Sequence, residues 1–570
     1  MSAWVRTSDN LQLAEAPERV EALWNDMISN NIQPSPQTYS TIMTAWAKSG
    51  RKDAPEQVQR WIDSMLVDTE ITTNIYMWNA LIHAWAKSGR HDSGERATEI
   101  VHVMKTQFDI EPDVAIYNTW MDAITKSGET EAAHRVDKIL LDMENNFIMG
   151  RSRIAPDHFT YSAVLQSWAK SGFSNAPERC LELLEQMQRS RYGQKGQPQL
   201  GPLAPSTQCY DAVIDCWARS GRPDAEVRAI ELLNKMETLS TKKGNVLEPT
   251  VRTYNAVLTA LARAGQGEKA QALLERMFRL NVTPNVHCYS NVITAYANST
   301  PPNPGAALDV LRRMKQHSDC KPNVISYSSA ISAFAKVGDP YQAKPLLDEM
   351  VDISQSENDI KMMPNIVTIN SVLEAFANAQ SFESAERAEE FLYAIPTNYA
   401  NIQPDVVSFS TVMLAWANLG EGARAERILE KMEESFQHSD SEKMCANVVS
   451  YTTAIKAWSK SDDIDAPAHV ERILNKMHDH FKHGKKHLKP NQITITTAIS
   501  AYTHARYEGK FAPKAQQLLY EMIQEYEAGN RSMKPQKPAF NMVRNALIKR
   551  GEEEEALKVE QQELKLLGDK

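Results

Sequence analysis

The chain has 570 residues, more than a single hydrophobic core usually serves, so several domains or one long repeat array are expected. Hydrophobic residues make up 42% and charged residues 24%, an ordinary globular composition, and no apolar run is long enough for a membrane helix. The formal net charge of -9 argues against a nucleic-acid partner unless positive charge is segregated locally.

The chain resembles itself at intervals of 35 to 49 residues. Close copies are "TYSTIMTAWAKSG", "MWNALIHAWAKSG" and "TYSAVLQSWAKSG". Aligning the segments before each aromatic residue, such as "IEPDVAIYN" and "IQPDVVSFS", gives unit starts at Pro36, Ile75, Val114, His158, Thr207, Val251, Val286, Val324, Ile366, Val406, Val448, Gln492 and Lys537. We expect a truncated repeat over 1–35, which suggests a fragment, then twelve tandem repeats over 36–536, and a shortened repeat with a capping helix over 537–570.

Each unit is predicted to hold two helices. In the first, Tyr39, Met43 and Trp46 fall on one apolar stripe, and Gly50 ends the helix. No unit can bury such a stripe alone, so we expect an all-α fold in which antiparallel helix-turn-helix hairpins stack into an α-solenoid. A bulky apolar slot is predicted to form the core, at Trp46, Trp85, Ile124, Trp168, Trp217, Leu261, Tyr296, Phe334, Phe376, Trp416, Trp458 and Tyr502.

Two polar positions in each unit are not explained by packing. An inner position directly follows the aromatic residue inside the first helix, and it holds Ser40, Asn79, Asn118, Ser162, Asp211, Asn255, Ser290, Ser328, Asn370, Ser410, Thr452 and Thr496. A closing position ends each unit, and it holds Asn74, Asp113, Asp157, Ser206, Thr250, Asn285, Asn323, Asn365, Asp405, Asn447, Asn491 and Gln536. Helix capping alone would explain most closing residues, but it requires no second polar residue five positions further on. The pair therefore favours a surface that recognises a ligand.

A cation recurs eight residues after the inner position. It is Lys48, Lys87, Lys126, Lys170, Arg219, Arg263, Lys336 and Lys460, with Lys549 in the last unit. On a helix eight residues span about 12 Å and turn by about 80°, so the cation lies further along the same broad face. A stripe of positive charge would suit a nucleic acid despite the net charge. The alternative is a set of ordinary basic residues at helix C-termini, where the macrodipole favours them.

Units with "P-D-V-x-x-Y-N" and a helix ending in "A-K-S-G" resemble P-class pentatricopeptide repeats (PPR), and the resemblance covers nearly the whole chain. It implies a right-handed superhelix that binds single-stranded RNA, one base per repeat from the 5′ end, and supports organellar RNA processing, stability or translation. The inner and closing residues would select the base, and the repeated cation would meet phosphate. The position three before the inner one would sandwich the base, with apolar residues at Tyr76, Phe159, Ile325, Val367, Val407, Val449 and Ile493.

The family's pairing preferences assign a base to most units. Inner Ser or Thr with closing Asn implies A, Asn with Asp implies U, and Asn with Asn implies C. A closing Asp can accept the ring N–H of uracil, and a closing Asn can donate to a ring nitrogen. The hypothesised target is 5′-AUUNNCAAUAAN-3′. No base is assigned to the pairs Ser162 and Ser206, Asp211 and Thr250, or Thr496 and Gln536.

We expect a binding protein and not an enzyme, with no cofactor and no metal. The sequence has no G-x-x-x-x-G-K-[ST] loop, no H-E-x-x-H and no H-x-E with a following C-x-x-C. Six scattered cysteines favour reduced, buried thiols: Cys180, Cys209, Cys216, Cys288, Cys320 and Cys445. The alternatives are a ribosome- or ribonucleoprotein-associated PPR protein that reads little sequence, and a tetratricopeptide-like protein-binding scaffold. Further ribonucleoprotein or processing-enzyme partners are conceivable, and no membrane is expected. By resemblance, we expect a mitochondrion or plastid.

Overall fold

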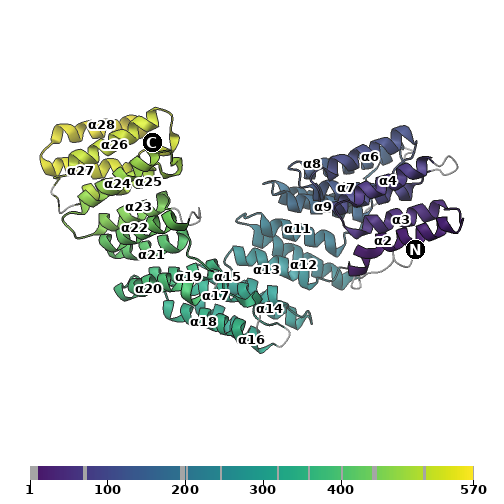
Figure 1. Cartoon of the computed structure of the whole chain (residues 1–570), viewed down its shortest axis with the longest axis horizontal. Coiled ribbons are helices and arrows are strands. Elements are labelled where there is room, and N and C mark those ends of the chain that lie inside the picture. The colour runs from purple at the N-terminus through teal and green to yellow at the C-terminus, as the bar shows by residue number, and fades with distance from the viewer. Residues whose placement is uncertain are drawn as a thin grey trace. The chain divides into compact units, whose positions relative to one another are not determined.

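The computed structural model describes residues 10–67, 73–189, 191–192, 199–200, 203–243, 247–317, 320–356, 360–399, 402–439, 446–504, 507 and 509–568. Most of these residues are helical (Figure 1). One pair of two-residue strands interrupts the helices, where β1 (Arg191–Tyr192) pairs antiparallel with β2 (Gln199–Leu200). Three 3-10 turns cover Ile360–Met362, Lys486–Leu488 and Arg531–Met533.

Helices alternate between two kinds after an initial α2 (Asn10–Ser29). A first helix begins at each of the unit starts expected from the sequence: α3 (Pro36–Ser49), α5 (Ile75–Ser88), α7 (Val114–Ser127), α9 (His158–Ser171), α11 (Thr207–Arg219), α13 (Val251–Arg263), α15 (Val286–Asn298), α17 (Val324–Val337), α19 (Ile366–Asn378), α21 (Val406–Leu419), α23 (Val448–Lys460), α25 (Gln492–Tyr502) and α27 (Lys537–Arg550).

A second helix follows each first helix. These are α4 (Ala54–Val67), α6 (Ser93–Gln107), α8 (Ala132–Ile148), α10 (Ala176–Gln188), α12 (Ala225–Lys243), α14 (Gly267–Arg279), α16 (Pro304–Gln316), α18 (Pro340–Ser356), α20 (Phe382–Asn398), α22 (Gly422–Ser439), α24 (Ala466–Lys482), α26 (Ala512–Glu527) and α28 (Glu553–Leu567). The turn between the two helices of a pair often holds a glycine with positive φ, such as Gly50 at 70° and Gly420 at 77°, a conformation that glycine adopts without strain.

The chain forms two compact units, Met1–Ala264 with Glu275–Thr283 and Gly265–Leu274 with Pro284–Lys570. Within each unit, a first helix packs against its own second helix and against the first helix of the next pair. The predicted α-solenoid of helical hairpins is thus confirmed in each unit. First helices consequently form a continuous row in each unit, and residues at equivalent positions on them form columns. None of the described helices has the length and apolar character needed to cross a membrane.

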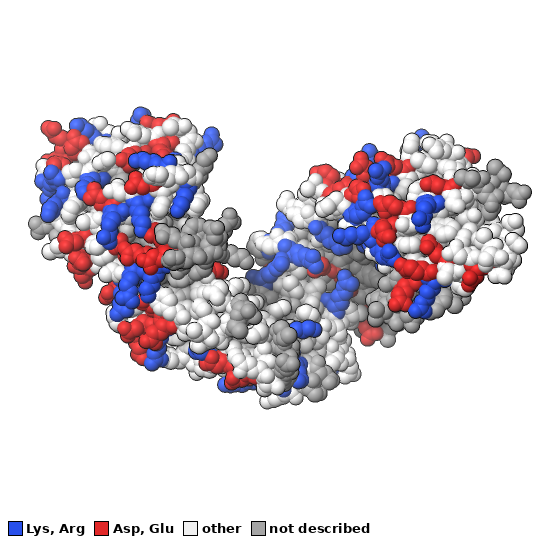
Figure 2. Space-filling view, in the orientation of Figure 1, with Lys and Arg blue, Asp and Glu red and all other residues white. Residues whose placement is uncertain are grey.

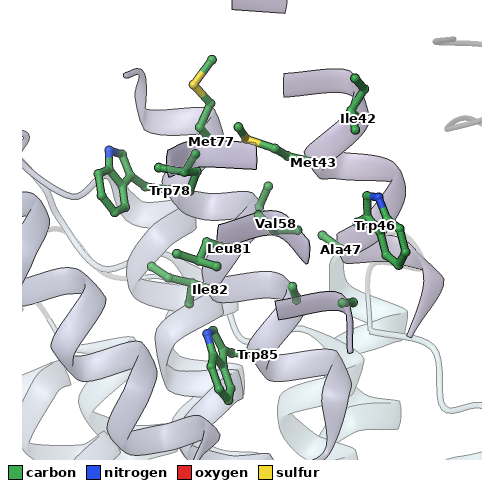
Figure 3. Packing of buried hydrophobic residues seen from close by; sticks show 14 of the residues in the cluster. Ile42, Met43, Trp46, Ala47, Val58, Met77, Trp78, Leu81, Ile82 and Trp85 are labelled. Carbon is green, nitrogen blue, oxygen red and sulfur yellow. The ribbon is translucent and has the colours of Figure 1, made fainter. Parts of the chain in front are cut away.

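The aromatic slot lies in the core, as predicted. Every member of the slot is 9% exposed or less, and Trp416 is fully buried. Figure 3 shows how Trp46 and Trp85 pack among neighbouring apolar side chains of α3, α4 and α5. Several indoles also donate to a carboxylate on a second helix, as Trp416 Nε1 does to Glu389 (3.0 Å) and Trp458 Nε1 to Glu426 (3.0 Å).

Carboxylates on second helices accept hydrogen bonds from tyrosine hydroxyls on first helices, a feature that sequence analysis missed. Most of these bonds link neighbouring pairs, and the one between Tyr327 and Glu349 lies within the pair α17 and α18. The hydroxyl of Tyr254 donates to Glu237 (2.8 Å), and the hydroxyl of Tyr327 donates to Glu349 (3.1 Å). Equivalent bonds join Tyr161 to Glu144 and Tyr451 to Glu433. Burial raises the pKa of the Tyr254 and Tyr327 hydroxyls, which keeps these two side chains protonated as donors.

The described cysteines (Cys180, Cys209, Cys216, Cys288 and Cys320) are free and buried, as predicted, whereas Cys445 lies outside the described residues. Burial raises the pKa of the Cys288 thiol to about 11, so this side chain behaves as a small core residue and not as a nucleophile.

Candidate nucleic-acid interface

The closing residues are the N-caps of the first helices that follow them. A side-chain oxygen accepts the backbone N–H three residues on at Asn74, Asp113, Asp157, Asn285, Asn323, Asn365, Asp405, Asn447 and Asn491. Ser206 and Gln536 make no such bond, and Thr250 meets the hydroxyl of Thr253 (3.4 Å). The capping alternative considered from the sequence therefore describes most of these positions.

Capping also fixes which atom of each closing residue remains for a ligand. A backbone N–H can only donate, so the atom that meets it must be an acceptor oxygen. In Asn365, Oδ1 accepts from Thr368 N (2.9 Å), which turns the Nδ2 amide away from the helix as a donor. In Asp113, Oδ1 accepts from Ile116 N (2.9 Å), which leaves Oδ2 as an acceptor. All nine capping residues are half-buried or exposed.

The inner residues lie on the first helix of their own unit, near the closing residue of the same unit. Most are half-buried, whereas Ser162, Asp211 and Ser290 are buried. Two pairs meet directly, because Nδ2 of Asn118 donates to Asp157 (3.4 Å) and Nδ2 of Asn370 donates to Asp405 (3.1 Å). The structure thus brings together side chains that lie 39 and 35 residues apart in sequence.

Some inner residues have a buried polar atom without a partner or a shifted pKa. Oδ1 of Asn79 and Oδ1 of Asn118 are buried and have no hydrogen-bond partner among the described residues. An unpartnered buried oxygen costs free energy unless water or a ligand satisfies it. Burial raises the pKa of the Asp211 carboxyl, while a hydrogen bond from Thr253 (2.6 Å) opposes the shift.

The seven apolar residues predicted to sandwich bases are all exposed, although they lie on otherwise well-packed helices. Each occupies the second position of a first helix, two residues after a capping residue, and between 55% and 72% of its side chain is exposed. The set is Tyr76, Phe159, Ile325, Val367, Val407, Val449 and Ile493. Single exposed apolar residues are common on protein surfaces, but recurrence at one helical position marks a contact surface.

The repeated cations are exposed at the C-terminal ends of the first helices, and several are engaged within the protein. Arg263 donates to the carbonyl of Ala218 (2.9 Å), and Lys336 donates to the carbonyl of Ala297 (3.0 Å). Each bond provides a donor for a backbone carbonyl at the C-terminal end of the preceding first helix. Ion pairs join Lys126 to Asp122 and Arg219 to Asp215 on their own helices.

Other cations of this column are available to a ligand. Lys87, Lys170 and Lys460 make no hydrogen bond or ion pair with the part of the chain that the structure describes. On the face drawn in Figure 2, basic and acidic side chains alternate over most helices, but Lys and Arg gather over α11 and α13. The cation column therefore combines structural contacts with local positive charge.

Family models match several segments of the chain. The pentatricopeptide repeat domain matches residues 61–127, 279–337 and 397–438. The PPR repeat family matches 249–298, and the PPR repeat matches 325–354. The chain is a pentatricopeptide repeat protein. The tetratricopeptide-like alternative is thereby set aside.

Curated relatives of this PPR protein resemble parts of it. A chloroplastic pentatricopeptide repeat-containing protein of Arabidopsis thaliana is 25% identical over 188 residues, which are 33% of this chain and 34% of that protein. A mitochondrial one from the same plant is 24% identical over 191 residues, which are 32% of this chain and 41% of that protein. The matches span only about a third of the first relatives' own length.

The crystal structure of the pentatricopeptide repeat protein PPR10 from maize shares the fold. The two align with a TM-score of 0.51 at 19% sequence identity, over 98% of this chain and 78% of PPR10.

Proposed function

We propose that this PPR protein, of the P-class, binds single-stranded RNA with one base per repeat, and that its target is 5′-AUUNNCAAUAAN-3′. The observation that carries the proposal is the column of seven exposed apolar side chains beside capped closing residues. A base inserted between two such side chains would lie against apolar surface, with its hydrogen-bonding edge toward the inner and closing residues.

The capping geometry supports the assigned bases by its chemistry. The acceptor Oδ2 of Asp405 suits the N3–H of uracil, because an ionised carboxylate can only accept. The donor Nδ2 of Asn365 suits the N1 of adenine, which can only accept. Asn365 cannot exchange its oxygen and its nitrogen without losing the bond to the helix N-terminus, and Asp405 presents an acceptor to the ligand whichever of its oxygens makes that bond. Each capped unit would therefore present a fixed donor or acceptor, which is what base selection requires.

Phosphate contacts would come from the cations without internal partners, Lys87, Lys170 and Lys460, and from the basic surface over α11 and α13. Binding without catalysis would then occlude or hold unpaired a short RNA segment. We propose that this occurs in a mitochondrion or plastid, as the names of the relatives suggest. The maize protein has been crystallised with an 18-nt psaJ RNA element, but the proposal for this chain rests on its own side chains.

The test is binding of the purified chain to the target RNA, a scrambled RNA and a single-stranded DNA copy at fixed salt. A triple variant, Val367→Thr with Val407→Thr and Val449→Thr, changes the polarity of the exposed column but not its shape. Because each substitution replaces a methyl group that would contact a base by a hydroxyl, and burial of such a group contributes about 0.8 kcal/mol, the three changes together should lower affinity for the target by at least ~10-fold. Val103→Thr on the second helix α6 is a control that should bind normally. Equal affinity for target and scrambled RNA would favour a ribonucleoprotein-associated role with little readout, and absence of binding would refute RNA recognition.

A further inference from the structure

A buried hydroxyl lies behind most of the closing residues. Three residues after the closing position, at the third position of the following first helix, are Thr160, Thr253, Ser326, Thr368, Ser408, Ser450 and Thr494, and all are fully buried. The hydroxyl donates to Oδ1 of the closing residue, for example Ser408 to Asp405 (2.9 Å), Ser326 to Asn323 (3.0 Å) and Thr494 to Asn491 (2.9 Å).

The same hydroxyl also reaches the inner residue of the pair. Hydroxyl–hydroxyl bonds join Ser290 to Ser326 (2.9 Å), Ser328 to Thr368 (2.7 Å), Ser410 to Ser450 (3.2 Å) and Thr452 to Thr494 (2.7 Å). At the Asn370–Asp405 pair, Ser408 lies 2.6 Å from Oδ1 of Asn370. One buried residue thus contacts both members of a pair, although it has no access to solvent and would not touch RNA itself.

This arrangement restricts the orientation of both members of the Asn370–Asp405 pair. Oδ1 of Asp405 accepts from Ser408 N (2.9 Å) and from Nδ2 of Asn370 (3.1 Å), while the single hydroxyl proton of Ser408 is shared between Asp405 and Asn370. With Oδ1 engaged on its inner side, Oδ2 is the acceptor left for a base. Removal of the hydroxyl would leave Oδ1 of Asn370 without this donor and free the amide to rotate.

We propose that the buried hydroxyl is a positioning residue for base selection, which sharpens discrimination without contacting the RNA. The inference rests on the proposed function, because it concerns how strictly each unit reads its base. It adds a third determinant to each pair. Units with a buried Ser or Thr three residues after the closing residue should discriminate strongly between bases, and units with an apolar residue at that position should discriminate weakly.

The chain supplies an internal comparison. Asn79 with Asp113 and Asn370 with Asp405 are the same residue pair, and both are assigned U, at the second and ninth nucleotides of the target. The residue three positions after Asp405 is Ser408, whereas the residue three positions after Asp113 is the apolar Ile116. Oδ1 of Asn370 accepts from Ser408 (2.6 Å), whereas Oδ1 of Asn79 is buried without a partner among the described residues, as is Oδ1 of Asn118, which the Thr160 hydroxyl does not reach. The ninth nucleotide should therefore show a larger preference for U over C than the second.

The decisive variants are Ser408→Ala, which deletes the hydroxyl, and Ser408→Thr, which keeps it. Affinities are measured for target RNAs with U or C at the ninth nucleotide, and with U or C at the third nucleotide as a reference read by Asn118 and Asp157. We expect Ser408→Ala to reduce the ratio of U to C affinity at the ninth nucleotide about 3- to 10-fold, by the loss of one hydrogen bond. Ser408→Thr should restore the ratio, and the reference ratio should not change.

Two outcomes would overturn the inference while leaving the proposed function standing. One is an equal loss of affinity for the U and C targets in Ser408→Ala, which would mean that the hydroxyl only stabilises the helix start. The other is an unchanged ratio. Far-ultraviolet circular dichroism and hydrogen exchange of α21 check that each variant is folded. If the unmodified protein itself shows no preference for the target over scrambled RNA, the proposed function fails and this inference fails with it.

Discussion

Asp113→Asn is the substitution that separates base reading from helix capping. Oδ1 of Asp113 accepts from Ile116 N at 2.9 Å, and Asn caps helices as well as Asp does, so the start of α7 should keep its bond. The unfolding free energy should then change by less than about 0.5 kcal/mol, the usual range for a tolerated surface substitution. Only the second atom of the group changes, from the acceptor Oδ2 to the donor Nδ2.

The expected effect on binding follows from that one atom. With uracil at the second nucleotide, N3–H would lose its acceptor and face another donor, a mismatch that costs about 1–3 kcal/mol, or roughly 5- to 150-fold in affinity. Cytosine presents an acceptor at N3 and would gain a partner. Fluorescence anisotropy with each of the four bases at this nucleotide, at one salt concentration, should show the preference moving from U to C.

A matched control for this substitution is Asp113→Ala. It removes both atoms, so it should lose the cap, at a cost of about 1 kcal/mol in stability, and lose the preference for U without gaining one for C. If Asp113→Asn binds the U and C targets in the ratio of the unmodified protein, closing residues only cap helices and the proposed code is refuted.

Three further substitutions test charge. Lys87→Ala should reduce the slope of log affinity against log salt by about 0.7, the value for one phosphate contact on a single strand, and an unchanged slope would exclude a phosphate role for Lys87. Lys336→Ala should chiefly weaken hydrogen-exchange protection at the end of α15, because Lys336 donates to the carbonyl of Ala297. Burial raises the pKa of Asp211 above its unfolded value, so stability from this group is highest in acid, falls as pH rises through the folded pKa and stays reduced at neutral pH. Asp211→Asn, which keeps an acceptor for Thr253, should therefore raise the unfolding temperature at pH 7 but not near pH 4, and an equal gain at both pH values would contradict the desolvation argument.

The helices and the core could be predicted because their signals are local and repeated. A proline, or its replacement, stands directly before the polar cap of each first helix, and the helix carries an apolar stripe and commonly ends at glycine. Every unit therefore repeats the same boundary signals. Substitutions within the aromatic slot, such as Ile124 and Leu261 among tryptophans, preserve apolar volume, and the structure buries both completely. The exposure of Tyr76 and Val367 followed from the same register, since the second helical position lies off the stripe.

Contacts between neighbouring pairs could not be predicted in the same way. The bond from Tyr254 to Glu237 joins residues 17 apart, and the bond from Ser408 to Asn370 joins residues 38 apart, across loops of variable length. A period places such residues in columns but does not say which side chains meet. A signal was present nonetheless, in the hydroxyl that recurs three residues after the closing position and in the "ME" that recurs in α8, α12 and α22. The contacts of the repeated cations within the protein could not be predicted for the same reason, because the carbonyl that Lys336 reaches belongs to the preceding unit.

Capping and reading are not competing explanations of the closing position. A helix start needs an oxygen on a short side chain, which restricts the position largely to Asp, Asn, Ser and Thr. Of these, only Asp and Asn have a second polar atom after the cap bond is made, an acceptor in one case and a donor in the other. Stability therefore limits the position to residues from which base selection can follow. Ser206 and Gln536, which make no cap bond, belong to two of the three units to which no base is assigned. A closing residue whose orientation the helix does not fix offers no defined atom to a base, so these units should tolerate any nucleotide.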